Sequence, residues 1–141
     1  MFRPLAFVLA LWGCAAYAAE LDEARARVNY MLNCQGCHLP DGRGYRGKVP
    51  DMRHTIGRFA GVAGGREFLV RVPGAATSPL SDAQLAELMN WMLREISVEP
   101  LPGSFSAFTA EEVGALRETP LTDVQALRRE LAISAGVAAD Y

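Results

Sequence analysis

Apolar and polar residues recur along this chain with the period of amphipathic helices rather than of strands. Residues 20–32 and residues 81–96 carry the pattern most clearly, and Ser81 or Asp82 can cap the start of the second stretch. A shorter amphipathic piece covers residues 66–72. We therefore expect an all-α fold with no strand of any length. The predicted apolar faces are Ala24, Val28, Met31 and Leu32 in the first stretch, and Leu85, Leu88, Met89, Met92 and Ile96 in the second.

The pattern changes between and after these helices. Residues 40–65 are rich in Gly, Pro and Arg. Because Gly and Pro interrupt helices and strands, we expect no long regular element there. Further along, Thr109 and Glu112 have the spacing of a capping box, which predicts a helix to about Arg117. Residues 121–131 predict one more helix.

The first residues have the layout of a secretory signal peptide. Arg3 precedes an apolar run over residues 5–12, and small residues follow up to an A-x-A sequence that ends at Ala18. The apolar run is far shorter than the roughly 20 residues of a membrane-spanning helix. We therefore expect residues 1–18 to be removed on export. The mature chain then begins at Ala19, has no transmembrane segment and lies in the periplasm.

Two alternatives for this segment stay open. It can remain as an uncleaved N-terminal anchor. The sequence before Cys14 also resembles a bacterial lipoprotein signal, in which acylation of the cysteine tethers the protein to a membrane surface, although Trp12 departs from the small residue expected there. Removal of the signal peptide leaves only Cys34 and Cys37. A disulfide between them closes almost no chain and adds little stability, so these two thiols serve another purpose.

The candidate chemistry lies in the sequence Cys34-Gln35-Gly36-Cys37-His38. Two thiols three positions apart at a helix end can add to the two vinyl groups of one haem, and the adjacent histidine then lies under the iron. CxxCH is the sequence signal of this attachment. A thioredoxin-like redox pair also uses CxxC, but it needs alternating strands and helices, which the pattern lacks. A zinc site needs four ligands, and the mature chain offers just the two cysteines, His38 and His54, of which Cys37 and His38 are adjacent and poorly placed for tetrahedral coordination.

The chain also resembles a family, the class I cytochromes c, over about residues 20–96. Ala26 and Tyr30 stand where the family places a small residue and an aromatic residue that meet the last helix. Leu88 and Trp91 stand where that last helix has an apolar residue and an aromatic residue in the crossing. The resemblance implies a small helical domain around one covalent haem.

Two further patches of the resemblance concern the haem surroundings. The loop Val49-Pro50-Asp51-Met52 resembles the family's Gly-Pro-x-Leu loop. The resemblance implies that the carbonyl of Pro50 accepts the proton of the ligand histidine, which fixes its orientation, and that Met52 packs on the proximal side. Gly57-Arg58 resembles the Gly-Arg that reaches a haem propionate, a carboxylate that arginine suits bidentately. The expected haem-binding residues are Cys34, Cys37, Pro50, Met52 and Arg58, with His38 as the proximal iron ligand.

Taken together, these observations predict three segments. Residues 1–18 form the signal peptide, residues 19–98 the cytochrome c-like haem domain, and residues 99–141 a helical C-terminal extension that lies outside the resemblance. Its apolar residues either dock on a partner or cover the core of the domain itself; they are Phe105, Phe108, Val113 and Leu116.

One element departs from the family. Class I proteins supply a methionine to the far side of the iron from a loop before the last helix, and the corresponding residues 72–80 contain no Met, His or Lys. The sixth iron position is therefore either open or water-bound, or filled by Met89, Met92 or His54. An open position lowers the reduction potential relative to Met/His ligation, which raises it.

The resulting functional hypothesis is a periplasmic one-electron carrier with one haem c and its iron, and not an enzyme. Its expected partner is an exported dehydrogenase, reductase or oxidase rather than nucleic acid. Residues 24–71 carry a net charge of +6 and residues 72–141 a net charge of −6, an asymmetry that can steer an acidic partner. Two alternatives are a haem protein whose open iron binds a small ligand, as a gas sensor or weak peroxidase, and an accessory subunit of a redox complex.

Overall fold

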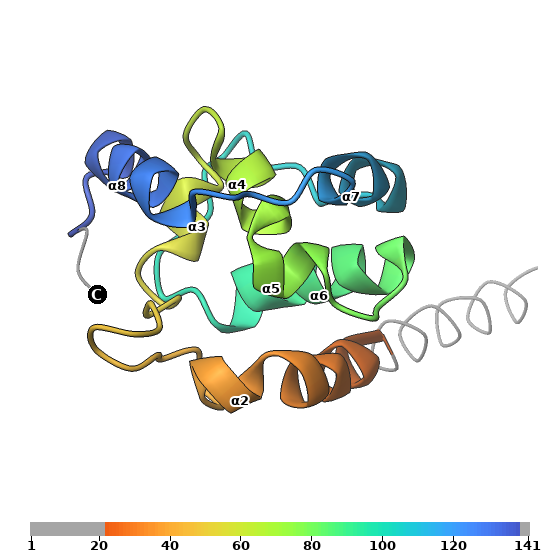
Figure 1. The fold of residues 1–141 in the computed structure, drawn as a ribbon. Coiled ribbons are helices and arrows are strands. Elements are labelled where there is room, and N and C mark those ends of the chain that lie inside the picture. Colours follow the sequence, from red (N-terminus) through yellow and green to blue (C-terminus); the bar gives the residue numbers. More distant parts are fainter. Residues whose placement is uncertain (1–21, 139–141) are drawn as a thin grey trace, which may run out of the picture.

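The computed structural model describes residues 22–138, and the predicted signal peptide, Cys14 and the predicted mature start at Ala19 lie outside them. Within this range the chain is helical without a strand, which confirms the all-α prediction; the only strand-like pairing there is a bridge between Tyr45 and Val49. The opening helix covers residues 22–33. The others are α2 (Gln35–His38), α3 (Ile56–Phe59), α4 (Gly65–Arg71), α5 (Pro73–Ala76), α6 (Asp82–Glu95), α7 (Ala110–Arg117) and α8 (Val124–Ala135) (Figure 1).

The long helix α6 begins and ends where its sequence predicts. Ser81 is the N-cap, and its hydroxyl accepts a hydrogen bond from the backbone N–H of Gln84, while the Gln84 side chain accepts one from the N–H of Ser81. This reciprocal pair satisfies two of the backbone donors that a helix start leaves free. The helix closes at Ile96, whose N–H still bonds the carbonyl of Met92.

The crossing of the opening helix and α6 has the two aromatic residues expected there. Tyr30 and Trp91 lie with their ring centroids 5.5 Å apart, and Ala26 and Leu88 are buried beside them. The ion pair between Arg25 and Glu87, at 2.8 Å, also joins the two helices.

The prediction of which face of the opening helix is buried is wrong. Ala26, Asn29 and Tyr30 are the buried residues of this helix. The physical reason is that a small residue and an aromatic residue allow a close approach to α6, and this contact sets which face is buried. The face predicted from periodicity points to solvent and consists of Ala24, Val28, Met31 and Leu32.

The C-terminal extension covers the core of the domain itself. Phe108 and Val113 are buried, and the backbone of Phe108 exchanges two hydrogen bonds with the side-chain amide of Asn90, at 2.8 and 3.0 Å. Figure 1 shows α7 beside α6 at one end of the molecule and α8 beside α3 at the other. Of the two roles considered for its apolar residues, packing on the domain core is the one observed.

The capping box predicted at the start of α7 is only half formed. The hydroxyl of Thr109 accepts a hydrogen bond from the N–H of Glu112, as expected. The carboxylate of Glu112 instead binds the guanidinium of Arg66 in α4 through two bonds of 2.9 and 2.7 Å. A long-range bidentate ion pair thus takes the place of the local contact, and it fastens the extension to α4.

The charge asymmetry seen in the sequence is partly compensated within the molecule. Besides Arg66, Arg25 pairs with Glu87 and Arg58 with Glu99. Three basic side chains of the positive first half therefore bind acidic side chains of the negative second half. This pairing reduces the charge dipole that the sequence alone suggests.

Candidate haem site

The two cysteines and the histidine are arranged by a short helical turn. Cys34 follows the opening helix, and its carbonyl accepts hydrogen bonds from the N–H groups of Cys37 and His38, at 3.1 and 2.9 Å. Both thiols are free. The turn ends at Leu39, which has a positive φ of 54°, a backbone conformation that residues other than glycine rarely adopt.

Tyr30 fixes the backbone directly after the histidine. Its hydroxyl donates a hydrogen bond to the carbonyl of Leu39 at 2.6 Å, and the carbonyl of His38 lies 3.3 Å away. The side chain is 1% exposed, and burial is the main cause that raises its pKa to about 12. Sequence reasoning identified Tyr30 only as a packing residue and did not foresee this bond.

A cavity of about 500 Å³ opens beside the motif. Its volume lies within the range of roughly 300–1,000 Å³ that is usual for cofactor sites, and its lining is predominantly apolar. Helices α3, α4, α5, α6 and α8 all contribute to its wall. The polar, charged and sulfur-bearing residues on the wall are Asn33, Cys34, Cys37, His38, Lys48, Met52, Thr55, Ser78, Met89, Met92, Gln125 and Arg128.

The surroundings of His38 suit an iron ligand. Burial lowers the pKa of His38, the carbonyl of Pro50 raises it, the charge of Arg128 lowers it, and the net direction is downward. The neutral imidazole is the form that can donate a lone pair to a metal. The Nδ1 atom is buried and forms no hydrogen bond within residues 22–138. The carbonyl of Pro50 is the acceptor that the family resemblance assigns to it, and Pro50 and Met52 both line the cavity.

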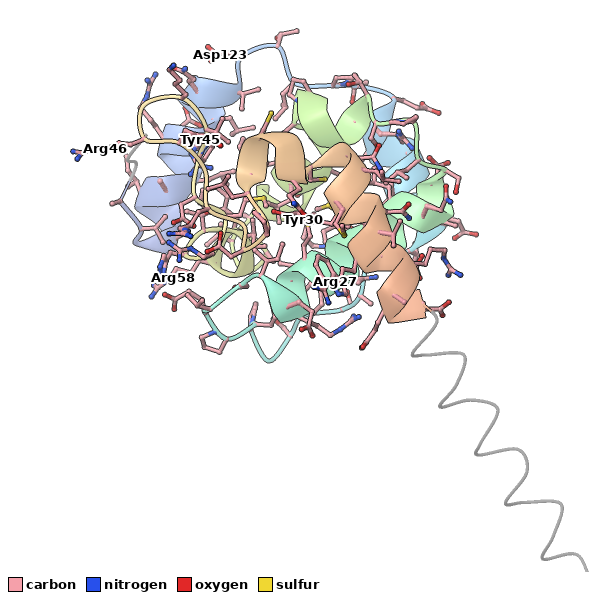
Figure 2. All side chains as sticks on the ribbon, turned by 90° about the horizontal axis from the view of Figure 1, so that it is seen from below. Arg27, Tyr30, Tyr45, Arg46, Arg58 and Asp123 are labelled. Carbon is pink, nitrogen blue, oxygen red and sulfur yellow. The ribbon has the colours of Figure 1, made fainter. Side chains whose placement is uncertain are left out.

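Arg58 and His54 lie away from the cavity. The guanidinium of Arg58 pairs with the carboxylate of Glu99 at 3.0 Å, and His54 lies 3.7 Å from the same carboxylate. Both side chains are well exposed, and Figure 2 shows Arg58 at the edge of the molecule. The structure therefore does not bring either residue to the site predicted for it, and Arg58 instead pairs with Glu99 at the start of the extension.

Arg128 lines the cavity although the sequence analysis did not name it as a site residue. It comes from α8 and is 6% exposed, with its guanidinium carbon 5.5 Å from the ring centroid of Phe59. A signal was present in the sequence, since Arg128 occupies a helical position between Val124 and Leu131 on the apolar stripe of α8. An arginine at such a position is seldom fully buried unless it has a partner.

The candidates for the sixth iron ligand differ in their position. Met89 and Met92 are buried on one face of α6 and line the cavity, whereas His54 does not. The loop of residues 72–80 also contributes to the wall, through Gly74, Ala75, Ser78 and Leu80 among others.

Comparison with known proteins identifies the family. The chain is 30% identical to a cytochrome c-552 of Thermus thermophilus over 145 aligned residues, which cover 90% of this chain and 94% of that protein. The chain is a c-type cytochrome. A second cytochrome c-552 of Thermus thermophilus is also 30% identical, over 67% of this cytochrome and 86% of its own length. No family model and no solved structure matches.

Membership of this family implies covalently bound haem c with its iron. The residues present fit such a group, because two free thiols and a half-buried histidine, whose pKa is lowered chiefly by burial, line one apolar cavity. Since only a tenth of the cytochrome lies outside the first match, most of residues 99–141 lie inside it. The likeness to known cytochromes therefore extends beyond residue 96, where the sequence resemblance ended.

Other kinds of site find no support in the described residues. Between residues 22 and 138, no three His, Cys, Asp or Glu side chains gather in a way that suits a metal ion, so the zinc alternative gains nothing there. Over the same range, no helix has the length and apolarity needed to span a membrane.

Proposed function

We propose that this cytochrome is an exported, periplasmic carrier of single electrons, with one haem attached through Cys34 and Cys37 and His38 as the proximal iron ligand. The observation that carries the proposal is the convergence of these three side chains on one apolar cavity of about 500 Å³. The likeness to two proteins named cytochrome c-552 supports it. When bound, the haem supplies an iron that gains and loses one electron.

The protein residues hold and orient this group. In the proposal, the carbonyl of Pro50 receives the ring proton of His38 and fixes the orientation of the imidazole. Met52 packs on the same side as the histidine. Arg128 takes the role first expected of Arg58, because its buried guanidinium at the cavity wall can meet a propionate carboxylate with two parallel hydrogen bonds.

The proposed partner is an exported dehydrogenase, reductase or oxidase with an acidic docking face. Lys48 lines the cavity, and the neighbouring Arg46 points outward from the loop in Figure 2. Neither side chain forms an ion pair within the part of the chain that the structure describes. Their charges are therefore free to attract an acidic surface to the haem edge.

Voltammetry of the purified cytochrome tests the carrier function. Protein made with a c-type maturation system should give one reversible wave with the width of a one-electron couple. The matched control is the Cys34→Ser, Cys37→Ser double variant, which should give no wave after its haem is extracted. A two-electron wave or an irreversible one would contradict the proposal.

A second candidate function is the binding of a small ligand at an open iron position. The specific observation in its favour is the composition of residues 72–80, which line the cavity and offer no Met, His or Lys. Ready binding of carbon monoxide to the reduced protein supports this function, and a six-coordinate low-spin spectrum that carbon monoxide does not change excludes it. Substitution of Met89 and Met92 one at a time then identifies which residue fills the position.

A further inference from the structure

A single arginine of the C-terminal extension holds residues 72–80 in place. This segment, called the loop before α6, includes the short helix α5. Arg117 in α7 donates from Nε to the carbonyl of Ala76 at 3.1 Å. Its Nη2 donates to the carbonyl of Ser78 at 2.6 Å, and its Nη1 to the carbonyl of Leu80 at 2.7 Å. Nη1 also pairs with Asp82 at 3.1 Å. The side chain is only 16% exposed.

These bonds hold three carbonyl groups of one short segment against one rigid planar group. A guanidinium presents its N–H donors in a fixed fork, so it fixes the direction of each carbonyl as well as its distance. The segment is also closed locally, since the N–H of Ser78 bonds the carbonyl of Ala75 and the hydroxyl of Thr77 bonds that of Pro73. The protein's own groups are thus sufficient to fix the loop.

The fixed loop presents one unused donor. The hydroxyl oxygen of Ser78 is buried and has no hydrogen-bond partner among residues 22–138, while Ser78 lines the cavity. Leaving a buried hydroxyl unsatisfied costs about 1–3 kcal/mol. The backbone of Ser78 is bonded on both sides, by its N–H and by its carbonyl, so this cost is not relieved by a shift of the loop.

The apolar surroundings of this hydroxyl define the ligand that it suits. Leu80, Leu85, Leu88 and Ala75 line the same cavity, and residues 72–80 contain no charged side chain, so a charged ligand at this wall loses hydration that the wall does not return. A small, uncharged molecule with one acceptor atom loses little and gains the hydrogen bond.

We propose that residues 72–80 form one wall of a binding site for a small uncharged molecule of the diatomic class, in which the Ser78 hydroxyl donates to the ligand and Arg117 positions that hydroxyl. The inference rests on the second candidate function, an open iron position. Arg117 is a positioning residue, because it bonds the loop backbone and does not itself line the cavity.

The test uses carbon monoxide as the probe on the reduced, haem-loaded protein. A hydrogen bond to the oxygen of bound carbon monoxide lowers its stretching frequency, which infrared spectroscopy measures. Ser78→Ala should move the band to higher frequency and weaken binding by roughly 2- to 10-fold, the equivalent of one hydrogen bond. Ser78→Thr, which keeps a hydroxyl, should restore the band. Arg117→Lys should split or broaden it, because a single ammonium cannot fix three carbonyl groups.

Ser134→Ala is the matched control, since this exposed hydroxyl bonds the carbonyl of Glu130 within α8 and Ser134 does not line the cavity. Its band should stay at the wild-type frequency. If carbon monoxide binds and Ser78→Ala leaves the band unchanged, the role of Ser78 is refuted while the open iron position stands. If carbon monoxide does not bind the wild-type protein, the open position and the role of Ser78 both fail. The serine variants decide the matter even if Arg117→Lys does not fold.

Discussion

Removal of one oxygen atom from Tyr30 should weaken the fold measurably. In Tyr30→Phe, the carbonyl of Leu39 loses its 2.6 Å hydrogen bond in a region where the tyrosine is 1% exposed, so water does not replace the lost donor. The carbonyl keeps a longer bond of 3.2 Å from the N–H of Gly42, so the loss is that of one intramolecular hydrogen bond, about 0.5–1.5 kcal/mol. The bond also holds Leu39 at a φ of 54°, a conformation that itself costs roughly 1–3 kcal/mol for a residue other than glycine. We expect a loss of roughly 0.5–1.5 kcal/mol in the free energy of unfolding.

Equilibrium unfolding of the haem-loaded protein in guanidinium chloride measures this loss. The midpoint should fall while the slope m stays constant, because phenylalanine fills the same space and the surface exposed on unfolding does not change. Tyr45→Phe is the matched control, since the Tyr45 side chain is 49% exposed and water can solvate its hydroxyl; it should change stability by less than about 0.5 kcal/mol. Equal midpoints for the two variants would refute the role assigned to the Tyr30 hydroxyl.

Three further outcomes follow from the structure. Phe108→Ala should destabilise the protein by about 3–5 kcal/mol in thermal or urea unfolding, because Phe108 is only 4% exposed; no loss would show that the extension is not part of the core. The Arg53 guanidinium holds the pKa of Asp51 below its ordinary value of 3.8, so wild type should be more stable than Asp51→Asn above about pH 4, and this advantage should fade as the pH falls lower; a constant difference in a pH series would contradict it. Lys48→Glu should slow oxidation of the reduced protein by ferricyanide at low salt and weaken the salt dependence of that rate in stopped-flow measurements, whereas an unchanged rate would remove Lys48 from the docking surface.

The sequence predicts the helices best where local chemistry decides them. The start of α6 at the cap Ser81 and the start of α7 at Thr109 depend on side chains within three residues of the helix end, so both were predictable. Periodicity missed the buried face of the opening helix, because Ala26 is small and contributes little to an apolar stripe; only the family resemblance indicated that Ala26 and Tyr30 meet α6.

The candidate site shows the same division. The attachment residues are consecutive in the sequence, so a short motif reveals them. No motif shows which of Arg58 and Arg128 reaches the cavity, because the positions of both depend on long-range contacts. Glu99 draws one to the surface, and the packing of α8 on α3 brings the other to the cavity. The bonds of Arg117 to the loop of residues 72–80 likewise join segments about 40 residues apart, which no periodicity records.

Mass spectrometry under denaturing conditions tests the central proposal most directly. The mature protein, made with a c-type maturation system, should retain the mass of one haem after treatment with acidified organic solvent. Cys34→Ser and Cys37→Ser should each leave a single thioether or an unstable product, and the double variant should release its haem entirely. Release of intact haem from the wild-type protein by the same solvent would contradict covalent attachment at Cys34 and Cys37.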